Sequence, residues 1–241
     1  MEVALGIVQG ITEFLPVSSS GHLVLLEEVF GYNPPGVGLE VVLHLATALA
    51  VAVFFWRRLK GIYLSRYGLL VILGLLPAGL AGALLKDFFE AAFSNLLAVG
   101  LSFLLTSFVL LGTKFLKPKG KPINWKIALF VGLAQVLALL PGVSRSGITI
   151  AVGLALGLAP EEAFLFSFAM LLPAVLGAAV LEAKDIASVG NPLGLSLGFL
   201  ASFGFGLGSL WLLRHAVVSR WFWAFGLYTL VLAGISLALA L

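Results

Sequence analysis

The sequence predicts an all-α integral membrane protein with six transmembrane helices and two re-entrant helical hairpins in an inverted-topology repeat. Three observations carry this prediction: 61% of the 241 residues are hydrophobic, only 10% are charged, and long apolar runs recur along the chain. Soluble proteins carry about a quarter charged residues, so this chain has too few to cover a globular surface. It contains no cysteine, which excludes disulfide scaffolds and cysteine-ligated metal sites.

Transmembrane helices need about 20 predominantly apolar residues. Six stretches meet this requirement: residues 39–56, 67–85, 92–113, 162–182, 193–213 and 221–240. Two further apolar regions, residues 2–30 and 126–158, are each interrupted by a run of Pro, Ser and Gly. Because a helix does not continue smoothly through such a run, each region is either a kinked span or a hairpin of half-length helices.

The positive charges decide between these two structures. Of the fourteen Lys and Arg residues, eleven lie in three loops: Arg57, Arg58, Lys60 and Arg66; Lys114, Lys117, Lys119, Lys121 and Lys126; and Arg214 and Arg220. The positive-inside rule places these loops in the cytoplasm, and the alternate loops around Lys86 and Lys184 outside. The alternation holds if residues 126–158 enter the membrane from inside and return. By the same argument, residues 2–30 form a hairpin that enters from outside.

The two interrupted regions superimpose when the sequence is shifted by 126 positions. Six pairs then coincide: Gly6 with Gly132, Gln9 with Gln135, Val17 with Val143, Ser18 with Ser144, Ser20 with Ser146, and Gly21 with Gly147. We therefore expect one membrane domain, residues 1–241, built from repeats 1–113 and 126–241 of opposite orientation. Such repeats place a binding site where their broken helices meet. The alternative is a duplication that reflects only the history of assembly.

Serines at both interruptions indicate an anion site. Ser18 and Ser144 stand where a second half-helix would begin, and Ser is a favoured N-cap. The free N–H groups and the dipole of such a helix end attract anions, phosphate in particular. Ordinary capping is the alternative interpretation. The candidate phosphate-binding residues are Ser18, Ser20, Ser144, Arg145, Ser146 and Thr149.

The differences between the repeats favour a functional site. Glu13 in the first repeat corresponds to Leu139 in the second, and Ser19 corresponds to Arg145, so one turn carries an acid and the other a base. A charge at bilayer depth costs about 2.5–3.5 kcal/mol, and such residues usually face a cavity or a partner. A simple ion pair between Glu13 and Arg145 is the alternative. His22, one turn into the second half-helix, is a candidate acid or nucleophile, or else a packing residue.

Other polar side chains lie within reach of the first interruption. Gln9 and Glu13 are four residues apart, so they share one helix face. Glu13 is a candidate ligand for a divalent cation, or a base that activates a hydroxyl group. Glu40 and His44, one turn apart in the first predicted span, are expected to surround the site or to pair with each other.

The two interruptions read QGITEFLPVSSSGH at residues 9–22 and PGVSRSGIT at residues 141–149. Both resemble the motifs of the bacitracin-resistance family of undecaprenyl-diphosphatases, whose fold would cover the whole chain. The resemblance implies a phosphatase that removes the terminal phosphate of a C55 polyprenyl diphosphate and so recycles the cell-wall lipid carrier. It implies an active site at the outer face of a bacterial cell membrane and a divalent metal, Mg or Ca.

By resemblance, Gln9 and Glu13 belong to the acidic motif and are the metal candidates. Ser19 and His22 belong to the catalytic turn, and Arg145 to the phosphate clamp. Gln9 is the neutral option where many members have a second acid, and His44 stands where Gln is usual. Whether Ser19 or His22 attacks phosphorus stays open.

A polyprenyl-phosphate flippase is the rival interpretation, because inverted repeats with broken helices are also the architecture of transporters. The asymmetric set of acid, hydroxyl, imidazole and guanidinium favours chemistry, since transport needs no nucleophile. The expected partners are the lipid substrate, membrane lipids and, as an option that the sequence leaves open, a second copy of the chain. No nucleic acid is expected, because the basic residues read as topology signals.

Overall fold

The computed structural model of the chain describes residues 2–31, 37–117, 119–181 and 191–241. Within these ranges every regular element is a helix, and Lys121 and Leu158 form an isolated parallel β-bridge. The prediction of an all-α protein is therefore confirmed. The expected outer loop around Lys184 lies outside the described residues.

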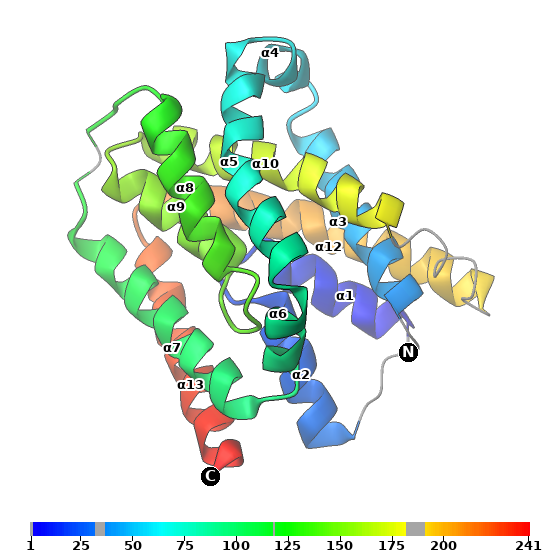
Figure 1. Cartoon of the computed structure of the whole chain (residues 1–241). Coiled ribbons are helices and arrows are strands. Elements are labelled where there is room, and N and C mark those ends of the chain that lie inside the picture. The colour runs from blue at the N-terminus through cyan, green and yellow to red at the C-terminus, as the bar shows by residue number, and fades with distance from the viewer. Residues whose placement is uncertain (1, 32–36, 118, 182–190) are drawn as a thin grey trace.

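Figure 1 shows how the helices are arranged in space. In chain order they are α1 (Glu2–Thr12), α2 (Ser19–Phe30), α3 (Val37–Phe54), α4 (Leu59–Tyr63), α5 (Arg66–Leu84), α6 (Lys86–Phe93), α7 (Leu96–Gly112), η1 (Thr113–Phe115), α8 (Trp125–Leu137), α9 (Arg145–Ala155), α10 (Pro160–Leu181), α12 (Pro192–Val218), η2 (Phe222–Ala224) and α13 (Phe225–Ala240).

Several helices have the length and composition of membrane spans. Within the described residues, 5 stretches are long and apolar enough to cross a membrane: Arg66–Leu84, Leu96–Phe115, Pro160–Leu181, Pro192–Val218 and Phe222–Ala240. They match five of the six predicted spans. The remaining predicted span, 39–56, is α3, whose apolar part Gly38–Phe54 falls among the shorter apolar helices. The chain is therefore a multi-pass membrane protein, and its span count depends on α3.

The structure corrects the start of the predicted span 92–113. Residues 86–93 form the separate short helix α6, and α7 begins only at Leu96. Asn95 causes this break, because its side-chain oxygen accepts the N–H of Ala98 at 3.1 Å and so caps α7. As a result α6 places Phe93 beside the polar centre of the molecule.

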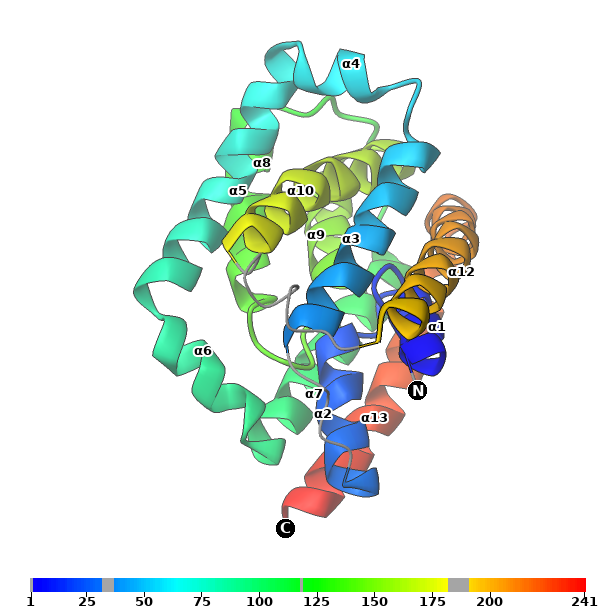
Figure 2. The same ribbon diagram turned by 90° about the vertical axis from the view of Figure 1, so that its right-hand side faces the viewer.

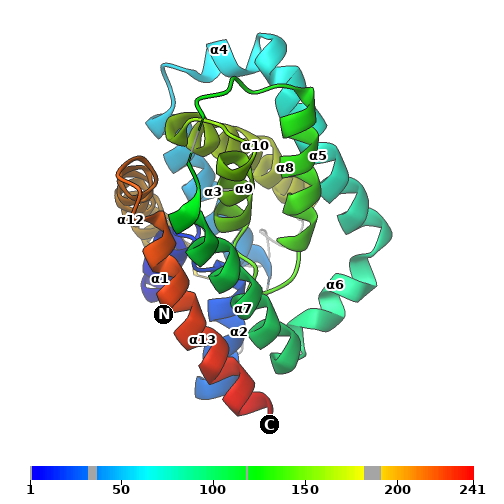
Figure 3. The same cartoon turned by 90° about the vertical axis from the view of Figure 1, so that its left-hand side faces the viewer.

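Both predicted interruptions break a helix, but the two broken regions differ in shape. The first break separates α1 from α2, and the second separates α8 from α9. In Figures 1 and 3, α8 and α9 lie side by side, whereas α2 turns away from α1. The sequence repeat therefore predicts where the helices break, and the surrounding packing decides the angle at each break.

Each broken region packs against the opposite half of the chain. Helix α1 lies along α12, and α8 lies along α5 (Figures 1 and 2). Glycines permit both contacts: a Cβ at Gly6 would lie 2.2 Å from the carbonyl oxygen of Gly198, and one at Gly132 would lie 2.3 Å from that of Gly74. Small residues that let backbones approach are typical of membrane helix pairs. The two halves thus make equivalent contacts with each other.

An aromatic cluster anchors the first turn to the core. Phe14 is fully buried and packs edge-to-face on Phe168 of α10, with ring centroids 5.4 Å apart. Phe55 and Phe164 complete the cluster. Pairs of this kind contribute about 0.5–1.5 kcal/mol beyond the burial of their area. Glu13, next to Phe14, therefore starts from a fixed backbone position.

Candidate active site

The turn between α1 and α2 is held by the side chain of Ser18. Its Oγ atom accepts the N–H of Gly21 at 3.3 Å, as expected for an N-cap, and also the N–H of Gly142 at 3.1 Å. Ser18 has a φ of 63°, in the left-handed region that a non-glycine residue rarely adopts. Such a conformation costs about 1–3 kcal/mol and persists only where the surroundings hold it in place.

The turn between α8 and α9 is capped in the same way but is not strained at its serine. Ser144 Oγ accepts the N–H of Gly147 at 3.1 Å, and Ser144 has an ordinary φ of −75°. The positive φ here belongs to Gly142, at 97°, where an added Cβ would lie 2.6 Å from the carbonyl oxygen of Val99. Thr106 of α7 fixes the loop by donating to the Gly142 carbonyl at 2.8 Å and accepting the Ser144 N–H at 3.1 Å.

The two turns therefore meet, as the inverted repeat predicts. The bond from the Gly142 N–H to Ser18 Oγ joins them directly. A Cβ at Gly21 would lie 2.9 Å from the Cα of Gly142, so the backbones touch as well. Helices α2 and α9 both begin at this junction.

A cavity of about 600 Å³ lies beside this junction. Its polar residues are Thr12, Glu13, Ser18, Ser19, Ser20, Glu40, His44, Ser144 and Arg145. Its apolar residues are Leu23, Val24, Val41, Phe93, Ala138, Leu139, Val143, Leu171, Ala174, Val175, Ala178 and Ala179. A cavity lined both by charged and hydroxyl side chains and by apolar side chains suits an amphiphile with an anionic head.

Glu13 is the centre of the polar wall. Its Oε2 atom accepts hydrogen bonds from Ser19 Oγ at 3.0 Å and from Gln9 Nε2 at 3.0 Å. The same oxygen lies 3.5 Å from His44 Nδ1, which in turn is 2.9 Å from Gln9 Nε2. A carboxylate that accepts the proton of a serine hydroxyl is the arrangement of a general base and its nucleophile.

Arg145 enters the cavity from the first residue of α9. Its Nη2 atom donates to the carbonyl oxygen of Ser167 at 2.8 Å, while Nη1 is buried without a hydrogen-bond partner among the described residues. No ion pair joins Arg145 to Glu13 within the part of the chain that the structure describes. Arg145 is instead hydrogen-bonded to the backbone of α10. A buried guanidinium with a free donor beside a cavity is suited to bind an anion.

His22 points away from Glu13. Its ring Nδ1 lies 2.7 Å from the Ser18 carbonyl, so this nitrogen donates, and Nε2 lies 2.7 Å from the hydroxyl of Tyr228. The ring stacks on Tyr228 with centroids 5.7 Å apart. Among the described residues, the cavity wall does not include His22. His22 is therefore bonded to the turn at Ser18 and to Tyr228 and does not line the cavity. Nothing in the sequence indicated that Tyr228 would be its partner.

The remaining predicted residues divide between the wall and its support. Ser20 and Ser144 line the cavity. Ser146 is buried 3.3 Å from Ser144 Oγ, and Thr149 is buried with its hydroxyl 2.7 Å from Ser167 Oγ, so both support α9. Glu40 and His44 line the cavity next to Glu13.

The side chains of the cavity can hold a divalent cation only if a bound phosphate compound supplies further oxygen atoms. Among the described residues, no group of three or more His, Asp or Glu side chains is placed to bind a metal. Two carboxylates, of Glu13 and Glu40, face the cavity. Within the described residues the hydrogen bonds of Glu13 all end on Oε2, which leaves Oε1 available. Mg²⁺ is commonly bound by one or two carboxylates plus phosphate oxygens and water, and this wall fits that pattern.

Residues 2–235 match the model of a protein family described as bacitracin resistance protein BacA. The chain belongs to the BacA family. This confirms the family that the motifs at residues 9–22 and 141–149 predicted, and the match covers both turns and all the described helices up to α13.

Curated relatives of this BacA-family chain carry a common name. An undecaprenyl-diphosphatase of Methanosphaera stadtmanae is 39% identical over 89% of this chain and 88% of its own length. One of Halothermothrix orenii is 36% identical over 97% of both chains. One of Thermosipho melanesiensis is 38% identical over 99% of this chain and 98% of its own.

Proposed function

We propose that this chain is an integral membrane phosphatase that hydrolyses undecaprenyl diphosphate to the monophosphate and inorganic phosphate. The family and the shared name of its relatives support this activity. The observation that carries it in the structure is the hydrogen bond from Ser19 to Glu13 in the same cavity wall as the free donor of Arg145. In the cell this reaction recycles the lipid carrier of the cell wall and, as the family name says, opposes bacitracin.

The geometry supports Ser19, rather than His22, as the nucleophile. Ser19 Oγ attacks the terminal phosphorus while its proton passes to Glu13. The bond from phosphorus to the bridging oxygen breaks, and the polyprenyl monophosphate leaves. Glu13 gives this proton to the departing bridging oxygen and is a carboxylate again. Water then attacks the phosphoserine and gives a proton to Glu13, which passes it to Ser19 Oγ as the bond from phosphorus to Ser19 breaks and phosphate is released. Arg145 and the N–H groups at both helix ends bind the phosphoryl oxygens, whose charge must be neutralised in this reaction.

A Mg or Ca ion belongs to this proposal, and Glu13 and Glu40 would hold it together with the bound diphosphate. It would supply positive charge against the phosphate oxygens. Gln9 presents its amide nitrogen to Glu13 and His44, so its part is to orient the carboxylate.

The membrane arrangement completes the proposal. We assign six spans, with α3 as the sixth, and two re-entrant hairpins, α1–α2 and α8–α9. The basic loops near α4 and before α8 lie inside, and α2 and α6 lie outside, at opposite ends of Figure 1. The cavity is lined by Phe93 of α6 and Glu40 near the start of α3, so it faces outward in a bacterial plasma membrane. A homodimer stays a prediction, which light scattering in detergent tests.

A flippase for the polyprenyl phosphate is the second candidate. It is favoured by the equivalent glycine contacts of the two halves, Gly6 with Gly198 and Gly132 with Gly74, since such repeats allow alternating access. Hydrolysis and flipping are separable in detergent, where no transport occurs.

Phosphate release by purified protein in detergent tests the proposal. Wild-type protein is expected to release phosphate from a polyprenyl diphosphate, and Ser19→Ala to lose this activity. Ser196→Ala is the matched control, because Ser196 is exposed and bonded only to its own helix at the Pro192 carbonyl. Substrate labelled in its terminal phosphate is expected to leave label on Ser19 after rapid quenching. Normal turnover by Ser19→Ala would overturn the assignment of the nucleophile, and no release by wild-type protein would favour the flippase.

A further inference from the structure

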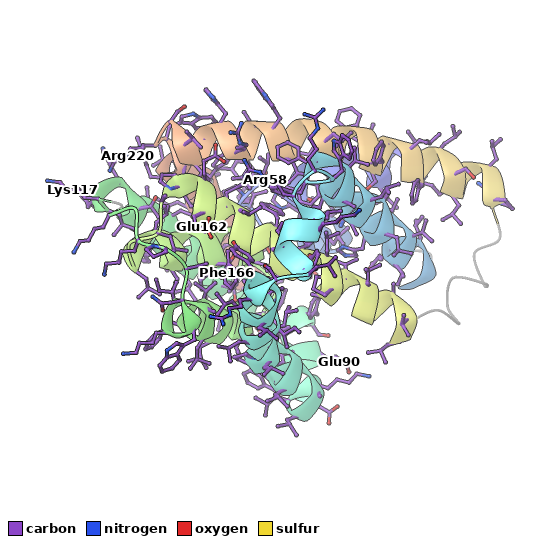
Figure 4. The ribbon with its side chains drawn as sticks, turned by 90° about the horizontal axis from the view of Figure 1, so that it is seen from above. Arg58, Glu90, Lys117, Glu162, Phe166 and Arg220 are labelled. Atoms are coloured by element: carbon purple, nitrogen blue, oxygen red, sulfur yellow. The ribbon has the colours of Figure 1, made fainter. Side chains whose placement is uncertain are left out.

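Helix α10 contains a carbonyl group that its own helix cannot satisfy. Pro173 lies inside α10 and has no N–H group, so the carbonyl oxygen of Ala169, four residues earlier, lacks its usual partner. The hydroxyl of Tyr63 donates to this oxygen at 2.7 Å. Tyr63 ends the short helix α4, whose segment crosses α10 when the molecule is seen from above (Figure 4).

The same stretch of α10 holds Arg145. The carbonyl oxygen of Ser167, two residues before Ala169, accepts Arg145 Nη2 at 2.8 Å. The Ser167 hydroxyl lies 2.7 Å from Thr149 Oγ1, which donates to the Arg145 carbonyl at 2.7 Å. Both the side chain and the backbone of Arg145 are thus tied to Ser167. Ser167 lies two residues before Ala169, the residue whose carbonyl Pro173 leaves without a partner, and a proline inside a helix is a usual cause of a local bend.

We propose that Tyr63 is a positioning residue for Arg145. By holding the Ala169 carbonyl at the proline, Tyr63 keeps the Ser167 carbonyl directed at Nη2. This fixes the guanidinium in the cavity wall, where its remaining donors bind phosphate. This inference rests on the proposed phosphatase activity. The proposed role links Tyr63, at the end of α4 near the basic loops, to Arg145, the anion-binding residue of the site.

The state of the Tyr63 hydroxyl agrees with this role. Burial raises the pKa of Tyr63 to about 12, so the group keeps its proton over the whole physiological pH range. It therefore acts as a constant donor.

The first test is Tyr63→Phe, which removes the hydroxyl and keeps the ring. Loss of one neutral hydrogen bond corresponds to a decrease in kcat for phosphate release of about two- to tenfold. Tyr67→Phe is the matched control: Tyr67 lies four residues further along the chain, in the first turn of α5, and its hydroxyl interacts with Glu162 rather than with the Ala169 carbonyl. This control should keep wild-type kcat. A normal kcat for Tyr63→Phe would overturn the inference, while the wild-type activity itself would still stand.

The second test asks whether Tyr63 acts through Arg145. In an Arg145→Lys background, where the planar fork is already lost, Tyr63→Phe should lower kcat less than twofold further. If the fold-decrease in kcat of the double variant equals the product of the two single decreases, the residues act independently, and the inference is overturned.

The third test separates positioning from simple capping. Pro173→Ala restores an N–H for the Ala169 carbonyl and straightens the helix. Added to Tyr63→Phe, it should restore thermal stability in detergent but not kcat. Recovery of both would mean that Tyr63 only satisfies a carbonyl, which would overturn the positioning role.

Discussion

Replacement of Arg145 by Lys separates the charge of this residue from its geometry. The guanidinium has two terminal nitrogens in different surroundings: Nη2 is bonded to the Ser167 carbonyl at 2.8 Å, and Nη1 is buried with no partner among the described residues. A single ammonium group has the same charge but only one nitrogen. In Arg145→Lys that nitrogen must either stay on Ser167 or reach the phosphate.

The expected loss follows from this choice. A hydrogen bond to a charged group contributes about 1.5–3 kcal/mol. If the bond to the phosphoryl group is lost in the transition state, kcat/KM falls by about ten- to a hundredfold. The fold should survive, because the Ser167 carbonyl keeps a charged donor.

The assay is phosphate release from a polyprenyl diphosphate by purified variants, alongside their thermal stability in detergent. Arg214→Lys is the matched control, since Arg214 is exposed and paired with Glu161. It should keep both turnover and stability. A folded Arg145→Lys protein with near-normal turnover would refute the reasoning. Its single nitrogen would then be enough both to hold the Ser167 carbonyl and to bind the phosphoryl group.

Four further predictions concern the acid, the second turn, the cation and the topology. Glu13→Gln should abolish phosphate release while Gln9→Ala costs much less, because only Glu13 carries charge; equal losses would remove its role as base or ligand. Gly142→Ala should lower stability by about 1–3 kcal/mol, since its φ of 97° is strained for any other residue, and an unchanged melting temperature would contradict the structure of this turn. Chelation of divalent cations should stop phosphate release and added Mg²⁺ should restore it, whereas activity that persists in excess chelator would exclude the cation. In this chain without native cysteine, a cysteine at Glu90 should react with an impermeant reagent in intact cells and one at Lys119 should not, so labelling at Lys119 would overturn the assigned orientation.

Much of the fold follows from local sequence patterns. Apolar runs predict the long helices, and the Pro, Ser and Gly run in each repeat predicts where a helix breaks. Ser18 and Ser144 cap the helices that follow, as their residue type predicts. These features depend on hydropathy and on backbone chemistry within a few residues, which is the information that a sequence states directly.

A single capping side chain sets the start of α7. Asn95 caps α7 at Leu96, so the first residues of the predicted span 92–113 belong to the separate helix α6. Hydropathy alone does not register one hydrogen bond from a side chain to the backbone, and that bond decides where the helix begins.

The sequence by itself also determined which chemical groups meet at the two turns, because the repeat placed Glu13 and Ser19 in one and Arg145 in the other. Only the tertiary structure decided how each group is used. It turned His22 toward Tyr228 rather than Glu13, and it paired Arg145 with a backbone carbonyl of α10. Partners of this kind lie many residues apart and on different helices. Their contact depends on helix angles set by glycine contacts and by the bend at Pro173, and no local pattern encodes such angles.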